Sequence, residues 1–230
     1  MKTIAIILAG GSGLRFNKDL PKQYIVVNNK TILEHTLKKF QENSSIDEII
    51  VALNDEHISQ SFKDNLVESY PKISTLTKNG SNRRLSIYNA LSAIKDDNCN
   101  VLVHNSTCPL VADDVISRCV TSLGKYDAVY PAVPMSNTIL MHKDGFVDKM
   151  PSRKDYMLSQ TPQGFKYEVL KKAHELAKNN PEVDELYNND IGIIWHYNLC
   201  KVKIIEGNRE NIKLTFPEDL IIFKALIGTI

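Results

Sequence analysis

The sequence predicts an α/β protein with a mostly parallel, doubly wound sheet and an inserted β-arm. Short apolar runs rich in β-branched residues alternate with segments of helical period as far as residue 133. After Pro134 this alternation stops, and the hairpin signal Lys-Asp-Gly lies between two short extended segments. Because 230 residues suit one α/β domain, we expect a single domain over residues 1–230, with the arm near residues 136–152.

The strands of the predicted sheet are short and apolar. Residues 3–8 read T-I-A-I-I-L and stop at Ala-Gly-Gly, which is typical of a strand buried on both faces. The other predicted strands are 46–53, 73–77, 101–103, 128–133 and 202–205.

The predicted helices carry apolar residues on one face. They cover 31–42, 56–69, a segment that begins at Ser81 or Asn82, 111–124 and 166–178, and a last one begins at Pro217. On the first helix, His35 is expected to be partly buried and hydrogen-bonded rather than a ligand. Residues 188–190 form a polar turn that caps the segment after it, and Trp195 is expected to be a packing residue.

Composition narrows the class of protein. The 28 basic and 27 acidic side chains leave a net charge of +1, which favours neither nucleic acid nor a membrane surface as a partner. No apolar run approaches the length of a membrane span, and Met1-Lys2 leads into a strand rather than a signal peptide, so we expect a cytoplasmic protein. The four cysteines form no C-x-x-C pair, which indicates reduced thiols and no zinc site.

A glycine-rich turn follows the first strand and reads Ala9-Gly10-Gly11-Ser12-Gly13. Glycine lets backbone N–H groups approach a phosphate closely at the carboxyl edge of a sheet. Arg15 and Lys22 add two cations near the same place. We interpret this stretch as the binding site of a nucleoside triphosphate, with an ordinary glycine turn and solvated cations as the structural alternative.

The glycine-rich turn matches one of three known nucleotide-binding glycine motifs. The P-loop string does not occur, and the dinucleotide fingerprint G-x-G-x-x-G lacks its third glycine because Phe16 occupies that position. The nearest candidate for the acid that binds ribose, Glu34, lies inside a predicted helix. The nucleotidyltransferase signature G-x-G-x-R followed by P-K fits in full, ending at Lys22.

A second glycine turn, at residues 78–86, precedes a helix and places Arg83 and Arg84 in its first turn. Arginine there opposes the helix dipole, so one of the two is a candidate for binding an anion; a solvated surface cation is the equal alternative. Residues 104–109 are polar and end in proline after a predicted strand, which suits a site loop at the carboxyl edge of the sheet.

Five strings spread over nearly the whole chain resemble the alditol-phosphate cytidylyltransferases: L-A-G-G-S-G-L-R, P-K-Q-Y, G-S-N-R-R-L-S-I, Q-T-P-Q-G-F and N-I-K-L-T-F-P-E-D-L. That family contains methylerythritol-phosphate enzymes of isoprenoid synthesis and ribitol-5-phosphate enzymes of teichoic acid and capsule synthesis. The resemblance implies a Rossmann-like nucleotidyltransferase fold and transfer of CMP from CTP to a polyol phosphate, with Mg²⁺ and release of pyrophosphate. The opening I-L-A-G-G resembles the ribitol branch, so a ribitol-5-phosphate-like acceptor is favoured, with methylerythritol phosphate as the alternative.

The resemblance also implies roles for individual residues. The catalytic cations would be Arg15, Lys22 and Lys213. The nucleotide would be bound by Leu8, Ala9, Gly10, Gly11, Ser12, Gly13, Gly80, Ser81, Arg83, Ser86 and Asn105. The acceptor would be held by Thr138, Arg153 and Thr161, and no residue is expected to ligate a metal. In the family the arm reaches across a homodimer, so a homodimer is the expected assembly.

The chain departs from the family pattern at the acceptor. Where the family has H-D-A-A-R-P, residues 104–109 read H-N-S-T-C-P, so Asn105 replaces an acid and Cys108 replaces an arginine. An asparagine can still hydrogen-bond ribose without a charge, whereas the lost arginine removes a bidentate contact. On the arm the family's D-T becomes Asn137-Thr138, and a later acidic pair is reduced to Asn189-Asp190. We therefore expect triphosphate binding to be retained and the acceptor pocket to be altered.

Two other functions compete with cytidylyl transfer. A nicotinamide-dependent oxidoreductase is disfavoured by the missing third glycine and ribose acid. A catalytically inactive nucleotide-binding protein is suggested by the changed loop at residues 104–109, but Arg15, Lys22 and Lys213 argue against it, since an inactive site has no need of all three cations.

Overall fold

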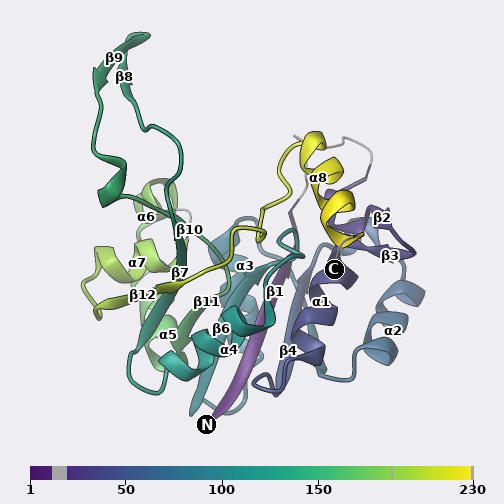
Figure 1. The fold of residues 1–230 in the computed structure, drawn as a ribbon. Coiled ribbons are helices and arrows are strands. Elements are labelled where there is room, and N and C mark those ends of the chain that lie inside the picture. Colours follow the sequence, from purple (N-terminus) through teal and green to yellow (C-terminus); the bar gives the residue numbers. More distant parts are fainter. Residues whose placement is uncertain (12–19, 188, 229–230) are drawn as a thin grey trace.

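The centre of the fold is a row of four parallel strands in the order β5–β4–β1–β6, of which Figure 1 labels β4, β1 and β6. The computed structural model describes residues 1–11, 20–187 and 189–228. The strands are β1 (Lys2–Ala9), β4 (Glu48–Leu53), β5 (Ile73–Lys78) and β6 (Cys99–Asn105). Ile6 stands opposite Ile50 on one side and Val103 on the other, and all three are buried. These strands lie where their apolar runs predict them, because a strand covered on both faces needs no polar alternation.

Beyond β6 the sheet becomes mixed. The antiparallel strand β11 (Gln163–Lys166) lies between β6 and β7 (Ala128–Pro134). The preceding strand β10 (Met157–Ser159) continues antiparallel along the far half of β7, and β12 (Val202–Glu206) pairs with β7 in parallel. The sequence patterns predict β7 and β12 but neither β10 nor β11. The fold class is confirmed as α/β with a mostly parallel sheet. The two antiparallel strands β10 and β11 are an addition that the sequence patterns do not predict.

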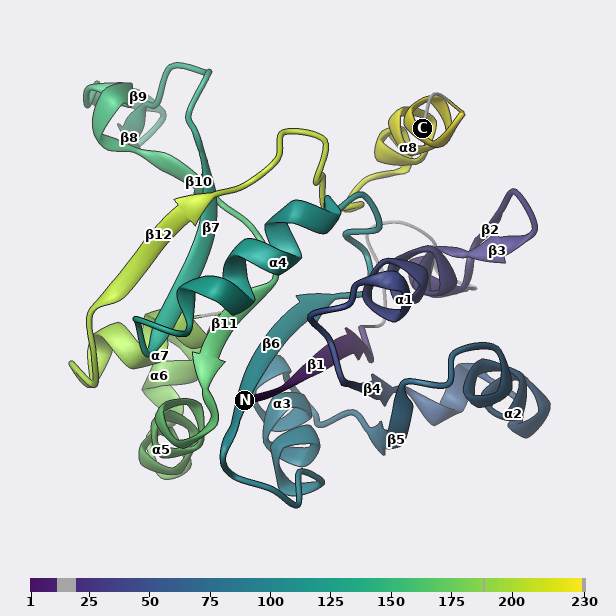
Figure 2. The ribbon, with the colours of Figure 1, turned by 60° about the horizontal axis from the view of Figure 1, so that its bottom comes forward.

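Helices cover both faces of the sheet (Figure 2). On one face lie α1 (Ile32–Glu42), α2 (Gln60–Ser69) and α4 (Asp113–Ser122). On the other lie α3 (Arg83–Ser92), α5 (Tyr167–Ala177) and α7 (Asp190–His196), with the short α6 (Pro181–Leu186) beside α5. Local chemistry fixes where they begin: Thr31 and Glu34 form a capping box on α1, and Asn82 and Asn189 cap α3 and α7 through their side chains. The helix predicted from residue 56 begins four residues later, after a short 3-10 turn at Asp55–His57.

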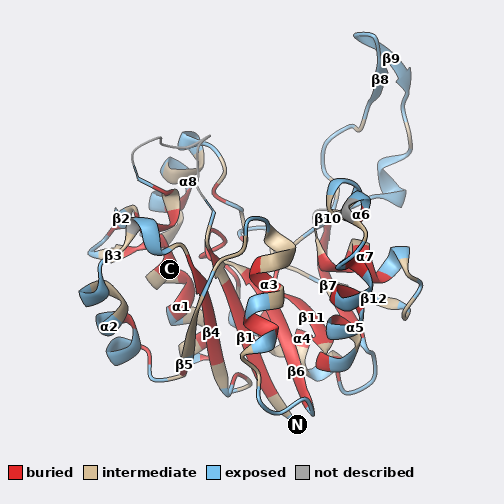
Figure 3. Ribbon diagram, turned by 180° about the vertical axis from the view of Figure 1, so that it is seen from behind, coloured by how far each residue is buried: buried red, intermediate tan, exposed pale blue. Residues whose placement is uncertain are grey.

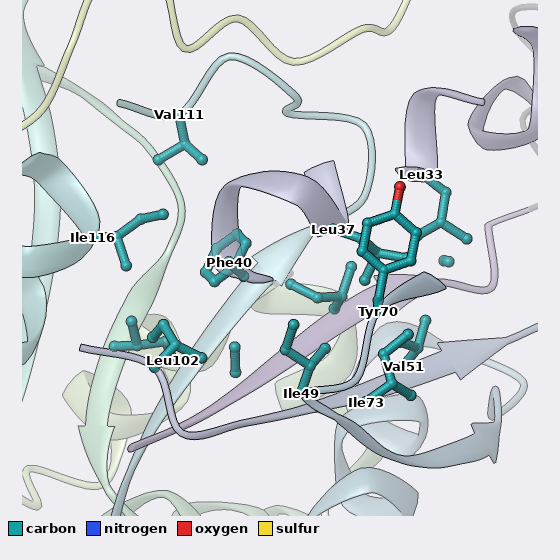
Figure 4. Packing of buried hydrophobic residues seen from close by; sticks show 14 of the residues in the cluster. Leu33, Leu37, Phe40, Ile49, Val51, Tyr70, Ile73, Leu102, Val111 and Ile116 are labelled. Carbon is teal, nitrogen blue, oxygen red and sulfur yellow. The ribbon is translucent and has the colours of Figure 1, made fainter. Parts of the chain in front are cut away.

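The two faces of the sheet hold separate hydrophobic clusters, which appear red in the burial view of Figure 3. Ala5 and Ile7 of β1 point to the α1–α4 face, and Ile4 and Ile6 point to the α3–α5 face, as alternation along a strand requires. Figure 4 shows the first cluster, in which Leu33, Leu37 and Phe40 of α1 pack on Ile49 and Val51 of β4. Each such buried side chain contributes roughly 1.5–3 kcal/mol, so the core fixes the sheet edge that carries the site.

The inserted arm lies at the predicted position and projects from the body of the molecule (Figure 1). It consists of β8 (Met141–Lys143) and β9 (Phe146–Lys149), joined at Asp144 and Gly145, whose φ angles are +52° and +86°. Two successive positive φ angles are typical of a tight hairpin turn and explain the Asp-Gly pair. Every residue of the two strands is exposed.

The remaining elements are short or terminal. The hairpin β2 (Val26–Val27) and β3 (Lys30–Thr31) precedes α1, 3-10 turns cover Lys22–Tyr24 and Arg153–Asp155, and α8 (Pro217–Ile227) ends the chain. His35 is half-buried and its Nε2 lies 2.8 Å from the carbonyl oxygen of Val27, which confirms the expectation for this residue. The expectation for Trp195 is wrong: α7 presents it outward, 70% exposed, with its ring against Tyr187. None of the helices in the described part of the chain has the length and apolarity to span a membrane.

Candidate functional site

A cavity of about 900 Å³ opens where the parallel strands end. Leu8 lies near the end of β1 and Gly10 follows that strand, Asn54 follows β4, Asn79 follows β5, and Asn105 ends β6, so four neighbouring strand ends form the wall of the cavity. Ligands of open α/β sheets bind at this carboxyl edge. We refer to this space as the nucleotide cavity.

The wall of the nucleotide cavity at β1 is fixed by Gln23. Its side-chain amide donates to the carbonyl oxygens of Ala9 and Gly11, both at 2.8 Å. On the opposite side Gly10 lies against Asn79, whose side chain would collide with any Cβ at position 10. The turn therefore needs glycine because another strand end approaches it closely. A side chain from the P-K-Q-Y string thus positions the glycine turn.

The wall at β5 is the turn before α3. The backbone N–H of Gly80 donates to the Ser86 hydroxyl at 3.0 Å, and that hydroxyl donates to the carbonyl oxygen of Asn82 at 2.9 Å. The Asn82 side chain in turn accepts from the N–H of Leu85 at 2.8 Å and caps α3. These bonds leave the exposed Ser81 at the lip of the cavity, with the start of α3 directed into it.

A second cavity, of about 750 Å³, lies beside the first. Its walls come from the ends of β6 and β7, from β10 and β11, and from the segment after β12. We refer to it as the acceptor cavity. Arg83, Asn105 and Lys213 line both cavities, so these three residues mark the junction between them.

The acceptor cavity is positively charged. Arg83, Arg209 and Lys213 line it, and no carboxylate does so among the lining residues that the structure describes. Three of its buried side chains, Thr161, Gln163 and Asn211, each have an oxygen with no hydrogen-bond partner among the residues that the structure describes. Unpaired buried polar atoms are costly, and a ligand carrying several hydroxyl groups could satisfy them.

Cys108 stands in this wall with its side chain buried. Burial raises the pKa of its thiol, although the Thr161 side chain and the charge of Lys213 act in the opposite direction. The thiol is therefore a neutral wall group rather than a nucleophile or a cation. Cys108 occupies the position where the family has an arginine, but its neutral thiol cannot supply the positive charge of that arginine.

Charge at the junction is balanced by one buried acid. Nη1 of Arg83 lies 2.5 Å from Oδ2 of Asp190, whose side chain is fully buried at the start of α7. Burial alone would raise the pKa of Asp190, but the charge of Arg83 and the hydrogen bond from His174 lower it to about 2. Asp190 is therefore ionised, and it holds Arg83 at the junction.

Most residues that the sequence assigns to the nucleotide lie together. The predicted nucleotide-binding residues that line the nucleotide cavity are Leu8, Gly10, Gly11, Gly80, Ser81, Arg83, Ser86 and Asn105. Two of the predicted catalytic cations, Lys22 and Lys213, line it as well. Ala9 is buried and does not line the cavity, since its carbonyl oxygen is turned to Gln23. Ser12, Gly13 and Arg15 lie outside the described residues.

The residues that the sequence assigns to the acceptor are divided. Thr161 lines the acceptor cavity, whereas Thr138 and Arg153 are exposed at the base of the arm and are not among the described residues that line either cavity. Arg153 instead donates to the carbonyl oxygen of Ser136 at 2.8 Å. Within one chain, the arm therefore carries Thr138 and Arg153 away from the cavity that Thr161 lines.

Sequence reasoning missed several residues of the two walls. Gln23, Asn79, Gln163, Arg209 and Asn211 line the cavities and were assigned no role. A usable signal existed for two of them, because a glutamine at a buried position of P-K-Q-Y and another in Q-T-P-Q must each find partners. Arg209 carried no such signal, since an arginine in a polar stretch is usually solvated.

The nucleotide cavity offers oxygen ligands for a divalent cation. The described residues contain no group of three or more His, Cys, Asp or Glu side chains arranged to hold a metal. The oxygen-bearing side chains of the nucleotide cavity include the Asn105 amide and the Glu56 carboxylate. Mg²⁺ commonly takes one or two protein oxygens and completes its shell with phosphates and water, so this donor set fits an ion that arrives with a triphosphate.

The fold and the paired cavities define a nucleotidyltransferase, and comparison with known proteins gives the family. The sequence profile described as IspD, 2-C-methyl-D-erythritol 4-phosphate cytidylyltransferase, matches residues 3–229. The chain therefore belongs to this family of CTP-dependent cytidylyltransferases, which confirms the resemblance seen in the sequence.

Similar proteins extend over nearly the whole chain. It is 37% identical over 223 residues to the 2-C-methyl-D-erythritol 4-phosphate cytidylyltransferase of Thermosipho melanesiensis, covering 94% of both chains. It is also 37% identical to the enzyme of that name from Clostridioides difficile, covering 97% of this chain and 92% of the relative. The crystal structure of 4-diphosphocytidyl-2C-methyl-D-erythritol synthase from Anaerococcus prevotii superposes with a TM-score of 0.85 at 27% identity, covering 99% of this chain and 96% of that one.

Proposed function

We propose that the protein transfers CMP from CTP to a polyol phosphate, with 2-C-methyl-D-erythritol 4-phosphate as the acceptor. The observation that carries this proposal is the pair of adjoining cavities that share Arg83, Asn105 and Lys213. One cavity is built for a nucleotide, the other for a hydroxylated anion, and the reacting phosphates meet where the two join.

The reaction needs positioning and charge neutralisation rather than a protein nucleophile. An oxygen of the acceptor phosphate attacks the α-phosphorus of CTP, a new P–O bond forms, and the bond to the β-phosphate breaks as pyrophosphate leaves. Lys213 and Arg83, at the junction, face the charge that builds up on the α-phosphate. Lys22 lies on the wall of the nucleotide cavity and binds the leaving phosphates, together with Arg15.

Mg²⁺ is the cofactor of this proposal and supplies further charge neutralisation to the phosphates when bound. Asn105 is the protein group that we assign to it at the junction. The rest of its shell comes from phosphate oxygens and water. The cytosine is recognised at the turn of Gly80, Ser81 and Ser86, where backbone groups and a hydroxyl are held at fixed distances.

Two acceptors follow from two different observations. The names of the relatives support methylerythritol phosphate better than the ribitol phosphate favoured by the opening I-L-A-G-G. Ribitol 5-phosphate remains the second candidate because Cys108 and Asn105 change the wall that would meet the acceptor. Without an arginine at position 108, Arg209 and Lys213 carry the positive charge of this wall.

The arm completes the acceptor cavity in this proposal. Its apolar residues Met141, Phe146 and Val147 are exposed in a single chain, which is unfavourable unless another surface covers them. In a homodimer the arm of one protomer brings Thr138 and Arg153 to the acceptor cavity of its partner. These two residues would then meet Thr161 across the interface.

The test is pyrophosphate release measured for each of the four nucleotides with both polyol phosphates. We expect turnover with CTP and methylerythritol phosphate, at a higher kcat/KM than with ribitol 5-phosphate. The same comparison is made in an Asn105→Asp, Cys108→Arg double variant, which restores the family's acid and arginine. Turnover with neither acceptor would reject the proposed function, and a preference for ribitol 5-phosphate that the double variant reverses would establish the second candidate.

A further inference from the structure

Behind the junction of the two cavities lies a chain of three side chains that ends at Arg83. Asp190 accepts from Nη1 of Arg83 at 2.5 Å through Oδ2, and from Nε2 of His174 at 2.9 Å through Oδ1. Asp190 and His174 are both 0% exposed, whereas the side chain of Arg83 is 26% exposed and lines both cavities. The chain therefore runs from the core, at α5, to the place where the two substrates meet.

The hydrogen bonds define the proton positions. A carboxylate can only accept, so Nε2 of His174 carries a proton. The other ring nitrogen of His174 is buried and has no hydrogen-bond partner among the described residues. Asp190 and Arg83 form one ion pair, which the hydrogen bond from His174 orients.

The neighbouring arginine offers an internal comparison. Arg84 makes a bidentate pair with Asp184 of α6, with Nε–Oδ1 and Nη2–Oδ2 distances of 2.6 and 3.0 Å. Arg84 is among the residues lining neither substrate cavity, and Asp184 is partly exposed. Two successive arginines on one helix are thus both paired to an aspartate, and only the pair that reaches the cavities is backed by a buried histidine.

We propose that Asp190 and His174 are positioning residues for the reaction, which act by holding the Arg83 guanidinium at the junction of the two cavities. This inference rests on the proposed function. An unrestrained arginine samples many rotamers, and fixing one of them in advance removes that entropy from the reacting complex. Since Asp190 occupies one end of the guanidinium, the N–H groups that it leaves can bind phosphate oxygens.

The geometry also explains why a buried acid is retained here. A buried ion pair is a poor source of stability compared with apolar packing, because both charges lose their hydration. Asp190 stands at the N-terminus of α7, where the helix dipole favours a negative charge, and His174 satisfies its second oxygen. The arrangement keeps a full negative charge behind Arg83 without letting water reach it.

The experiment is a double-mutant cycle on Arg83→Gln and Asp190→Asn, followed in kcat, in the KM of each substrate and in the Kd of CTP without acceptor. We expect Asp190→Asn to lower kcat roughly 10- to 100-fold, a large part of the loss in Arg83→Gln, since both remove a preorganised cation from the developing charge. We also expect each variant to weaken CTP binding roughly tenfold. In the Arg83→Gln background, Asp190→Asn should change neither quantity by more than about twofold, because residues that act as one unit are not additive.

Two further variants separate positioning from folding. His174→Leu removes the donor to Asp190 and should lower kcat, whereas His174→Gln can still donate and should restore most of it. Asp184→Asn is the matched control: it breaks the neighbouring ion pair and should lower the melting temperature without lowering kcat. Melting temperatures of all variants are measured alongside.

The outcomes are distinct. An Asp190→Asn enzyme with wild-type kcat and CTP affinity would overturn the inference, and so would effects of Asp190→Asn that are equally large with and without Arg83. If the wild type turns over neither polyol phosphate, the proposed function fails, and the cycle in CTP binding still decides whether Asp190 acts through Arg83.

Discussion

Lys213 lines both cavities, although it lies on a segment that is far from the parallel strands in sequence. Its backbone position is fixed by the next residue: the N–H of Leu214 donates to the carbonyl oxygen of Thr107 at 2.9 Å. The side chain is exposed. Within the described part of the chain, it makes no hydrogen bond that would hold it away from the junction. We infer a role at the reacting phosphate rather than in stability.

Lys213→Met is therefore expected to reduce kcat by roughly 10²–10³, as for the loss of one preorganised charge at a transition state. The melting temperature should stay unchanged because the side chain is exposed. Steady-state kinetics with CTP and the acceptor measure the first effect and thermal unfolding the second. Lys201→Met, at an exposed position that lines neither cavity, is the control, and a Lys213→Met enzyme as active as this control would contradict the assignment.

His104 makes a prediction about stability and pH. It is fully buried at the end of β6, with Nε2 3.0 Å from the carbonyl oxygen of Cys108, and burial lowers its pKa from 6.5 to about 4. Between these two values the unfolded chain binds a proton that the native state does not. The free energy of unfolding should therefore fall as the pH drops from about 6.5 to about 4, by up to about 3 kcal/mol.

The measurement is urea unfolding across this pH range in wild type, in His104→Gln and in His142→Gln as the control on the exposed arm. His104→Gln should lose most of the slope, and His142→Gln should retain it. Burial also lowers the pKa of His35, which contributes to the slope of all three proteins and cancels in the comparison. Equal slopes in wild type and His104→Gln would contradict the prediction, because they would show that the pKa of His104 in the native wild type is not lowered.

At the scale of elements, the strands of the parallel half of the sheet could be predicted from the sequence, whereas β10 and β11 of the mixed half could not. Ile4, Ile6 and Ile50 belong to runs that are apolar throughout, and that composition indicates a buried strand. β11 is short, and its Gln163 and Lys166 resemble a loop. It becomes a strand because β6 and β7 each leave an edge that it can pair with, and such tertiary pairing is invisible in local pattern.

The candidate site shows the same division. The glycine turns and cations of the nucleotide cavity follow strand ends, so a chain order of strand, turn and helix places them at one edge. The wall of the acceptor cavity comes instead from a network of amides. Asn208 accepts from the N–H of Ala112 and donates to the carbonyl oxygen of Leu110, while Gln160 binds its main chain on both sides. Arg209 lines the acceptor cavity because this network holds the segment around it. The spacing of residues in the sequence does not predict such a network.

At the scale of the whole molecule, we expect the arm to determine the assembly. The hairpin of β8 and β9 has no buried residue, so it contributes nothing to the core of its own chain. We expect the 26.0 kDa chain to form a homodimer with closed twofold symmetry, in which the arms are covered. Replacing residues 140–150 by a short glycine–serine linker should leave a folded monomer.

Light scattering measures the mass, and calorimetry with CTP checks the nucleotide cavity, which the arm does not line. The shortened protein should bind CTP as the wild type does and lose turnover with the acceptor, because Thr138 and Arg153 no longer reach a partner. Lys143→Ala, a single change at the exposed tip, is the control and should remain dimeric. A wild-type protein that scatters as a monomer at working concentration would exclude this assembly.

The late position of Lys213 has a consequence for synthesis. Chains emerge from the ribosome N-terminus first, and domains tend to fold as their elements become available. β1, β4 and β6 can pair before the segment at residues 207–214 exists outside the tunnel, so the glycine turns are in place while the junction still lacks its lysine. We therefore expect a nascent chain to bind a nucleotide before it can transfer the nucleotidyl group, since the proposed catalytic lysine is synthesised after the glycine turns.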